Sequence, residues 1–176
     1  GFEKYSISRI SGISDSDLRQ VGADIRSYIN SGYEPLDVQA RILGTERDLF
    51  NDREVAHMKD VKQLVRGVYA LALASALYLA AMVVTGFALY RGQFVADLAK
   101  RLAWGGGLTL VLLVVFGLVA LVGFDSVFLK FHQLSFANDF WRLDPRTDYL
   151  VRIFPQDFWF DATLWVAVRA ISGALA

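Results

Sequence analysis

Cysteine is absent from the sequence, and this absence excludes disulfides, thiol nucleophiles and cysteine-ligated metals. Net charge is absent too, because 18 basic residues balance 18 acidic residues. A nucleic-acid partner would require a basic surface that neutralises phosphates, so we expect no binding to nucleic acid. Histidine is scarce: His57 and His132 are the two in the chain, and they are therefore the first residues to consider for chemistry.

Hydrophobic residues, in contrast, make up 55% of the chain, and much of this share lies in two uncharged runs. Val68–Tyr90 and Leu102–Phe124 each hold about 23 residues, enough to cross roughly 30 Å of hydrocarbon as a helix. A third apolar run, residues 163–176, carries Arg169 and is too short to span, so it indicates the start of a last transmembrane helix. The chain begins at Gly1, without a methionine or a signal peptide, and we expect a fragment trimmed at both ends.

These runs predict an all-α-dominated polytopic membrane protein in four segments. Residues 1–66 form a small extracytoplasmic cap and a helix that leads into the membrane, and residues 67–124 form two transmembrane helices joined by a short cytoplasmic loop at 91–101. Residues 125–162 form a second extracytoplasmic segment, and residues 163–176 begin the last helix. The orientation follows from basic residues in the short loop, which mark the cytoplasmic side. They are Arg91, Lys100 and Arg101.

Local patterns predict three elements near the start of the chain. Apolar residues recur at helical spacing between Ser14, an N-cap candidate, and Asn30. Asn51 and Glu54 resemble a capping box, from which one long helix is predicted to run to the end of the first apolar run. The stretch Tyr5–Ile10 alternates polar and apolar residues, which predicts a short strand.

If the long helices are continuous, both histidines lie beyond the same side of the membrane and can meet there. Asp60 shares the helical face of His57, so its carboxylate can hold a ring N–H and set the tautomer. A histidine beside a carboxylate is the usual composition of a general base, because an imidazole titrates near neutral pH. The residues that share the face of His132 are Ser135, Phe136 and Asp139.

Other interpretations of these residues stay open. An interfacial histidine can be a hydrogen-bonded structural residue, and the aromatic side chains between residues 128 and 160 can form an interfacial belt or the wall of an acyl-chain pocket. A metal site would have to draw on the two histidines with Asp60 and Asp139, but no HxxxH or HxxE spacing supports one. We therefore expect neither a metal nor a cofactor. Neither apolar run carries an internal charge, which argues against a transporter.

Two motifs carry a family resemblance. The sequences REVAHMKDVK at 53–62 and FHQLSFANDFWRLDPRTDYLVRIFPQDFWFD at 131–161 resemble the bacterial integral-membrane family that contains the lipoprotein intramolecular transacylase called Lit. The resemblance covers about residues 45–161, and the first 44 residues loosely. It implies a bundle of four transmembrane helices, two of them complete here, in the bacterial cytoplasmic membrane, with an extracytoplasmic cap and the active site facing outside.

The resemblance also implies an activity and its residues. The family moves the sn-2 acyl chain of a diacylglyceryl-modified lipoprotein onto the amine of its own N-terminal cysteine, which gives a lyso-form lipoprotein. Its two catalytic histidines match His57 and His132. The expected partners are accordingly the lipid bilayer and a diacylglyceryl lipoprotein.

Chemistry suggests roles for these residues. One imidazole can take a proton from the attacking amine and the other can give one to the departing glyceryl oxygen. Because ester and amine belong to one molecule, the enzyme needs no nucleophile of its own. We expect His132 to be the base, Asn138 to donate to the developing oxyanion, and Asp60 and Asp139 to orient the rings. The expected lining of the substrate pocket is Arg53, Phe131, Phe136 and Trp141.

Two other functions compete with this one. A non-enzymatic scaffold or lipid-binding protein would use the histidines structurally, and their substitution would then change stability or assembly. A lipid esterase would use the same histidines with water as the nucleophile, and its products would be a lysolipid and a free fatty acid.

Overall fold

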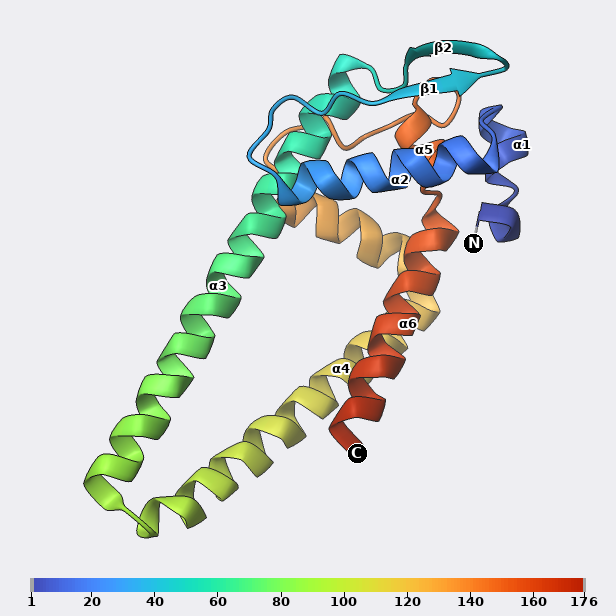
Figure 1. The fold of residues 1–176 in the computed structure, drawn as a ribbon. Helices are drawn as coiled ribbons and strands as arrows, with labels where there is room; N and C mark the ends of the chain where they lie inside the picture. The colour runs from blue at the N-terminus through green and yellow to red at the C-terminus, as the bar shows by residue number, and fades with distance from the viewer. Residues whose placement is uncertain (1, 176) are drawn as a thin grey trace. The chain divides into compact units, whose positions relative to one another are not determined.

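The structure is a computed structural model that describes residues 2–175; Gly1 and Ala176, the outer ends of two predicted segments, lie outside the described residues. The described chain is mostly helical, as the sequence predicts (Figure 1). Its elements are η1 (Phe2–Tyr5), α1 (Ile7–Ser11), α2 (Asp15–Asn30), β1 (Gln39–Ile42), β2 (Thr45–Asp48), α3 (Asp52–Tyr90), α4 (Gln93–Ser135), α5 (Tyr149–Ile153) and α6 (Gln156–Leu175).

The chain divides into two compact units. The first, which we call the histidine unit, comprises the described residues up to Val65 together with Phe128–Asp161. The second, which we call the apolar unit, comprises Arg66–Val127 and the described residues from Ala162 onward. Both histidines belong to the histidine unit, although one precedes and the other follows the two long apolar runs.

Helix α2 forms one wall of the core of the histidine unit. Its predicted apolar face is confirmed, because Leu18, Val21, Ile25 and Tyr28 are all buried. The Ser14 side chain accepts a hydrogen bond from the backbone N–H of Asp17, which satisfies one of the amides left free at a helix start. The local capping and periodicity signals were therefore sufficient to place this helix.

A two-stranded antiparallel hairpin, β1 with β2, packs beside α2 and was not predicted. Its strands are short, and β1 buries Ala40 and Ile42 while β2 is exposed throughout. The turn holds Leu43 at φ 50° and Gly44 at φ 87°. Both central positions need a positive φ in this kind of turn, and the common signal for it is Asn-Gly. The Leu43-Gly44 turn has the glycine of this signal but not the asparagine.

The strand predicted over Tyr5–Ile10 is wrong. Tyr5 closes η1, and α1 follows from Ile7 to Ser11. Ile7 and Ser11 are the buried residues of α1, and they are spaced as i and i+4 on one helical face. A short alternating stretch satisfies both periods in part, and contact with the core decided for the helix.

The long helix α3 begins as predicted. The Asn51 side chain accepts hydrogen bonds from the backbone N–H groups of Arg53 and Glu54, and the Glu54 carboxylate accepts one from the N–H of Asn51 at 2.9 Å. This is the reciprocal pattern of a capping box. Helix α3 then continues without interruption for 39 residues to Tyr90, which confirms the predicted single helix.

The connection between α3 and α4 is shorter than the predicted loop. Only Arg91 and Gly92 separate the two helices, and α4 already includes residues 93–101. The tight turn depends on Gly86, where a Cβ atom would lie 2.2 Å from the ring of Phe94. The Phe94 ring is buried there and meets Phe87 edge-on, with ring centroids 5.2 Å apart.

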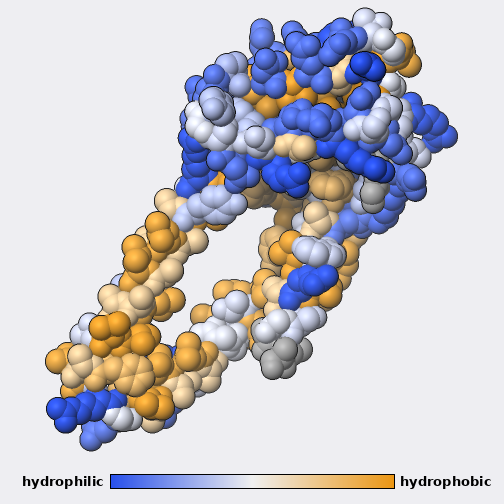
Figure 2. Space-filling model, in the orientation of Figure 1, coloured by the Kyte–Doolittle hydropathy of each residue, from blue (hydrophilic) through white to orange (hydrophobic). Residues whose placement is uncertain are grey.

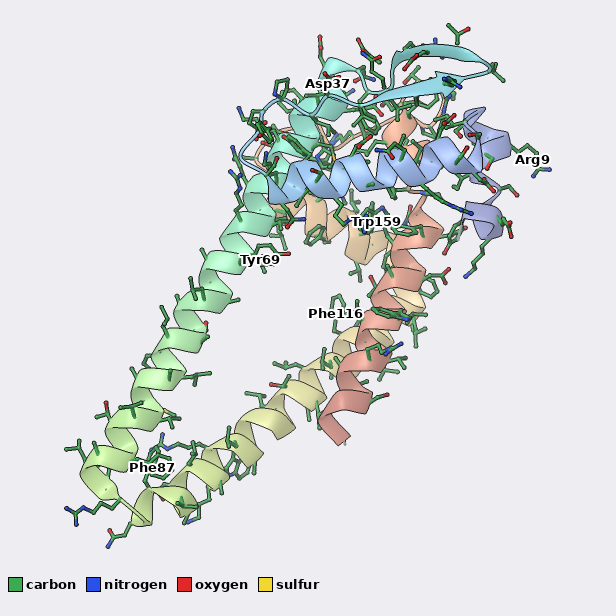
Figure 3. The ribbon with its side chains drawn as sticks, viewed as in Figure 1. Arg9, Asp37, Tyr69, Phe87, Phe116 and Trp159 are labelled. Atoms are coloured by element: carbon green, nitrogen blue, oxygen red, sulfur yellow. The ribbon has the colours of Figure 1, made fainter. Side chains whose placement is uncertain are left out.

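Helices α3 and α4 are both long and apolar enough to cross a membrane. Almost none of the side chains in their apolar windows is buried inside the protein, and Figure 2 shows hydrophobic residues on the drawn face of both. Tyr69, Phe87 and Phe116 are examples, exposed on the helix surfaces (Figure 3). Apolar side chains that no protein atom covers are suited to contact with lipid hydrocarbon. Helix α4 has a kink at Gly123, whose φ and ψ are −152° and 52°.

Candidate active site

The two histidines, far apart in the sequence, meet inside the histidine unit. His57 lies in the second turn of α3, before the apolar run of that helix, and His132 lies in the last turn of α4, beyond the kink at Gly123. Their ring centroids are 6.1 Å apart and the ring planes are inclined by 36°. Both side chains are almost fully enclosed, with exposed fractions of 7% for His57 and 9% for His132.

Aromatic rings surround the His132 imidazole. The centroid of Phe128 lies 4.3 Å from it, and those of Phe131 and Phe136 lie 5.4 Å and 5.7 Å away. Trp141 lies at 5.3 Å, and Phe136 also meets the His57 ring edge-on at 5.1 Å. Three of the four residues expected to line a substrate pocket are thus beside the histidines. This shell limits the access of water, which strengthens electrostatic interactions inside it.

A backbone contact determines the tautomer of His132. Its Nδ1 lies 2.8 Å from the carbonyl oxygen of Phe128, one turn earlier on α4. A carbonyl can only accept a hydrogen bond, so Nδ1 carries the proton in the neutral ring. The lone pair of neutral His132 is therefore on Nε2, the atom that would act as a base.

The Nδ1 atom of His57 differs from that of His132 in its hydrogen bonding. Its Nδ1 is buried and has no hydrogen-bond partner among the described residues. Burial lowers the pKa of His57 to about 4, with a further lowering from His132 and a partly opposing effect of the Asp60 charge. Burial also lowers the pKa of His132, against the effect of the Phe128 carbonyl. Both imidazoles are consequently uncharged at neutral pH.

Asp60 bonds to a different partner from the expected one. Its Oδ2 accepts a hydrogen bond of 2.8 Å from the Asn138 side-chain amide, and this bond joins α3 to the segment after α4. The Asn138 oxygen in turn accepts from the backbone N–H of Phe140 at 3.0 Å. Asp60 therefore acts on His57 through its charge and not through the ring N–H bond that the helical spacing suggested.

Arg53 and Asp139 form a second link between the same segments. The Arg53 guanidinium donates to the backbone carbonyl of Asp139 at 3.0 Å. The Asp139 carboxylate pairs with Arg142 at 3.0 Å, and both side chains of that pair are largely exposed. Arg53 and Asp139 thus join the start of α3 to the segment after α4. The pocket role expected of Arg53 and the ring-orienting role expected of Asp139 stay predictions.

Two buried acids anchor the start of α3. Neither was among the predicted site residues. Glu54 is 1% exposed, and besides its capping role it accepts a hydrogen bond from the backbone N–H of Leu150 at 2.6 Å. Burial is the main cause that raises the pKa of Glu54. Asp148 accepts from the Asn51 amide at 2.9 Å and from the backbone N–H of Asp144 at 2.7 Å. The capping box was the sequence signal for the Glu54 part of this network.

A fully buried lysine fixes α3 against α2. Lys62 has no exposed side-chain area, and its ammonium group lies 3.3 Å from a Glu34 oxygen and 3.9 Å from the ring centroid of Tyr28. It also donates to the carbonyl of Tyr33. Nothing in the sequence pattern indicated this burial, because lysine is usually solvated unless it is paired.

A cavity of about 270 Å³ lies beside Phe136. Its lining comes from α3 and from the end of α4 with the residues that follow: Asp60, Gln63, Leu64, Ser135, Phe136, Ala137 and Asn138. Phe136 is therefore shared between the cavity and the histidine pair. Among the described residues, no three acidic or histidine side chains come close enough together to hold a metal ion.

Comparison with known proteins identifies a family for this chain. The family described as lipoprotein intramolecular transacylase Lit matches residues 1–159. A protein of Aquifex aeolicus (strain VF5), described as uncharacterized, is 32% identical over 134 residues, which are 74% of this chain and 55% of that protein. The chain therefore spans about half the length of this relative.

Solved structures show the same fold. The membrane integral lipoprotein intramolecular transacylase Lit from Bacillus cereus superposes with a TM-score of 0.76 at 18% identity, over 99% of this chain and 75% of that one. A structure of the same protein with a histidine-to-arginine substitution gives 0.72 at 17% identity, over 99% and 72% of the two chains. Together with the match over residues 1–159, this shows that the chain belongs to the lipoprotein intramolecular transacylase Lit family, with a membrane-integral fold.

Proposed function

We propose that this protein is an acyltransferase that moves the sn-2 acyl chain of a diacylglyceryl lipoprotein to the amine of the lipoprotein's N-terminal cysteine. The product is a lyso-form lipoprotein. The observation that carries the proposal is the pair of buried, uncharged imidazoles 6.1 Å apart, one of which has its lone pair fixed on Nε2. Membership of the Lit family supports the same reaction class.

The atoms and protons of the transfer balance with the two imidazoles as the only proton carriers. The amine nitrogen attacks the ester carbonyl carbon, an N–C bond forms, and the carbonyl oxygen becomes negative. One N–H proton passes to Nε2 of His132, since the nitrogen of the adduct is far more acidic than the free amine. The C–O bond to the glyceryl oxygen then breaks, and that oxygen receives the proton. An amide and an alcohol result, and both imidazoles are neutral again.

The lowered pKa values explain why the proton taken from the amine is also the one given to the glyceryl oxygen. With a pKa of about 4, His57 is uncharged at neutral pH and cannot give a proton before it has received one. The proton for the glyceryl oxygen must therefore come from the amine, either directly from His132 or by way of His57. Burial in the aromatic shell makes an imidazolium costly, so the ring that takes the proton releases it readily.

Supporting groups surround the transfer. Asn138 uses one amide hydrogen on Asp60 and keeps a second, which we assign to the oxyanion that develops on the ester carbonyl. Phe131, Phe136 and Trp141 provide apolar surface at the imidazoles, suited to the first part of the acyl chain. Arg91 lies in the turn between α3 and α4, and Lys100 and Arg101 lie in the first three turns of α4. These basic residues favour the cytoplasm for this end of the two helices. His57 lies near the start of α3 and His132 near the end of α4, so we assign both to the extracytoplasmic side of a multi-pass protein with four transmembrane helices and an extracytoplasmic cap.

The test is to express the full-length protein in a bacterium that lacks the activity and to analyse a reporter lipoprotein's N-terminal lipopeptide by mass spectrometry. We expect an N-acylated, monoacyl-glyceryl cysteine, which disappears in the His57→Ala and His132→Ala proteins. Glu46→Gln, a change on the exposed strand β2, is the matched control and should keep full activity.

Each other outcome identifies a competing function. A monoacyl-glyceryl cysteine with a free amine, accompanied by a free fatty acid, would indicate an esterase that uses water. An unchanged diacylglyceryl peptide, from a protein shown to be folded and inserted, would indicate a scaffold or a lipid-binding protein. Either result would overturn the acyl-transfer proposal.

A further inference from the structure

The cavity beside Phe136 is small, and most of the residues that line it are polar. Its volume is about 270 Å³. Four of its seven lining residues are polar, namely Asp60, Gln63, Ser135 and Asn138. A ligand for this cavity is therefore a compact polar group.

The charge of the lining selects the sign of that group. Asp60 is the one charged residue of the lining, and one of its oxygens accepts from Asn138 while the other stays available. The buried lysine of α3, Lys62, is held by Glu34 and Tyr33, so it does not neutralise Asp60. A cavity with a carboxylate, a hydroxyl and two primary amides favours a positively charged group that donates several N–H bonds.

The position of the cavity connects it with the histidines. The Phe136 ring that lines the cavity lies 5.1 Å from the His57 ring and 5.7 Å from the His132 ring, between centroids. Asp60 is one helical turn from His57 on α3, close enough for its charge to act on that imidazole. Neither histidine lines the cavity, and the side chains that connect a group seated there with the two rings are Phe136 and Asp60.

We propose that this cavity is the subsite for the substrate's primary amine, which Asp60 holds by charge and hydrogen bonding and which Ser135 and Gln63 orient. The assignment rests on the proposed acyl transfer and adds the residues that select the nucleophile. An amine donates to a carboxylate in its neutral and in its protonated form. An ammonium that enters first gives its surplus proton to water, and the balance of the transfer is then the one given above.

The first measurement is equilibrium binding, which does not require turnover. The probes are S-glyceryl-cysteinyl-serine amide with a free amine and the same compound with an acetylated amine, titrated by calorimetry into the purified full-length protein. We expect the free amine to bind roughly tenfold or more tightly, the scale of one charged hydrogen bond. Asp60→Asn, which keeps an acceptor for Asn138, should bind both probes equally, and Glu46→Gln should behave as wild type.

A second variant guards against a folding defect. Gln63→Glu adds a carboxylate to the lining, so it should increase the preference for the free amine, a gain that misfolding does not produce. Equal binding of the two probes by the wild type, or no change in preference in both variants, would overturn the subsite.

Turnover separates this subsite from the proposed function. In the lyso-product assay with a synthetic diacylglyceryl lipopeptide, Asp60→Asn should raise KM about tenfold with a smaller change in kcat. A wild-type protein that prefers the free amine but forms no N-acylated product would contradict the acyl transfer alone. A wild type that forms product while Asp60→Asn keeps the wild-type KM would contradict the subsite alone.

Discussion

The Asn138 side-chain amide donates a 2.8 Å hydrogen bond to the Asp60 carboxylate, between residues 78 positions apart in the chain. This bond connects the motif around His57 with the motif around His132. Asp60 is one turn after His57, and Asn138 follows the last turn of α4, which carries His132. The bond therefore holds the two imidazoles in a fixed position relative to each other. The same two residues line the cavity that we assign to the amine.

Asn138→Ala should lower both stability and activity. The change removes a hydrogen bond to a charged group, and the expected loss in free energy of unfolding is about 1 to 2 kcal/mol. Activity should fall further than stability explains, since the oxyanion donor is lost as well. Urea-induced unfolding and the lyso-product assay measure the two effects. Asn30→Ala, which removes an exposed amide bonded to the Arg26 carbonyl, is the control. Full activity in Asn138→Ala would contradict the assigned role.

The His57 imidazole should make the protein less stable in acid. The unfolded chain binds a proton below about pH 6.5, whereas His57 in the folded state binds one only near pH 4. The unfolded state therefore holds more protons within this window, and stability falls as pH falls through it. The contribution of His57 is at most about 3 kcal/mol, and it levels off below about pH 4. His132 acts in the same direction, because its pKa is lowered too.

Thermal unfolding between pH 4 and pH 7 checks this dependence. The His57→Gln protein has no imidazole at this position, so its unfolding temperature should fall less than that of the wild type. Carboxylates titrate equally in both proteins and cancel in the comparison. Parallel curves for the two proteins would show that His57 is not buried in its neutral form.

His132→Asn should separate catalysis from structure. The Asn amide can still donate to the Phe128 carbonyl, as Nδ1 does in the native ring, but it offers no base at the position of Nε2. We expect activity to fall by about 10²- to 10⁴-fold. The free energy of unfolding should change by less than about 1 kcal/mol. His132→Leu, which also loses the bond, should be the less stable of the two. Substantial activity in His132→Asn would assign the base to another group.

Glu54→Ala should be the most destabilising of these substitutions. It leaves the buried backbone N–H of Leu150 and the part-buried N–H of Asn51 without this acceptor. Each such group costs about 1 to 3 kcal/mol, so the expected total is about 3 kcal/mol. Glu54→Gln keeps one carbonyl oxygen and should lose about half as much. Chemical denaturation measures the series, and equal stability of all three proteins would mean that these amides are bonded to other groups.

The local elements followed from sequence because their signals are local. Ser14 and the Asn51–Glu54 pair cap helices through residues three positions away, and apolar periodicity extends each helix from there. The two apolar runs are likewise a property of consecutive residues. Where the local signal was short or incomplete, prediction failed. Tyr5–Ile10 fitted both the strand repeat and the helical repeat in part. The Leu43-Gly44 turn carried only part of the usual Asn-Gly signal.

The sequence by itself determined the apolar helices, the scarcity of histidine and the two motifs that hold His57 and His132. The tertiary structure decided what those residues can do. Burial sets the low pKa of His57, a backbone carbonyl sets the tautomer of His132, and the pairing of Asp60 with Asn138 shapes the cavity. These properties depend on desolvation and on distances between segments far apart in the chain, and neither is encoded in the spacing of neighbouring residues.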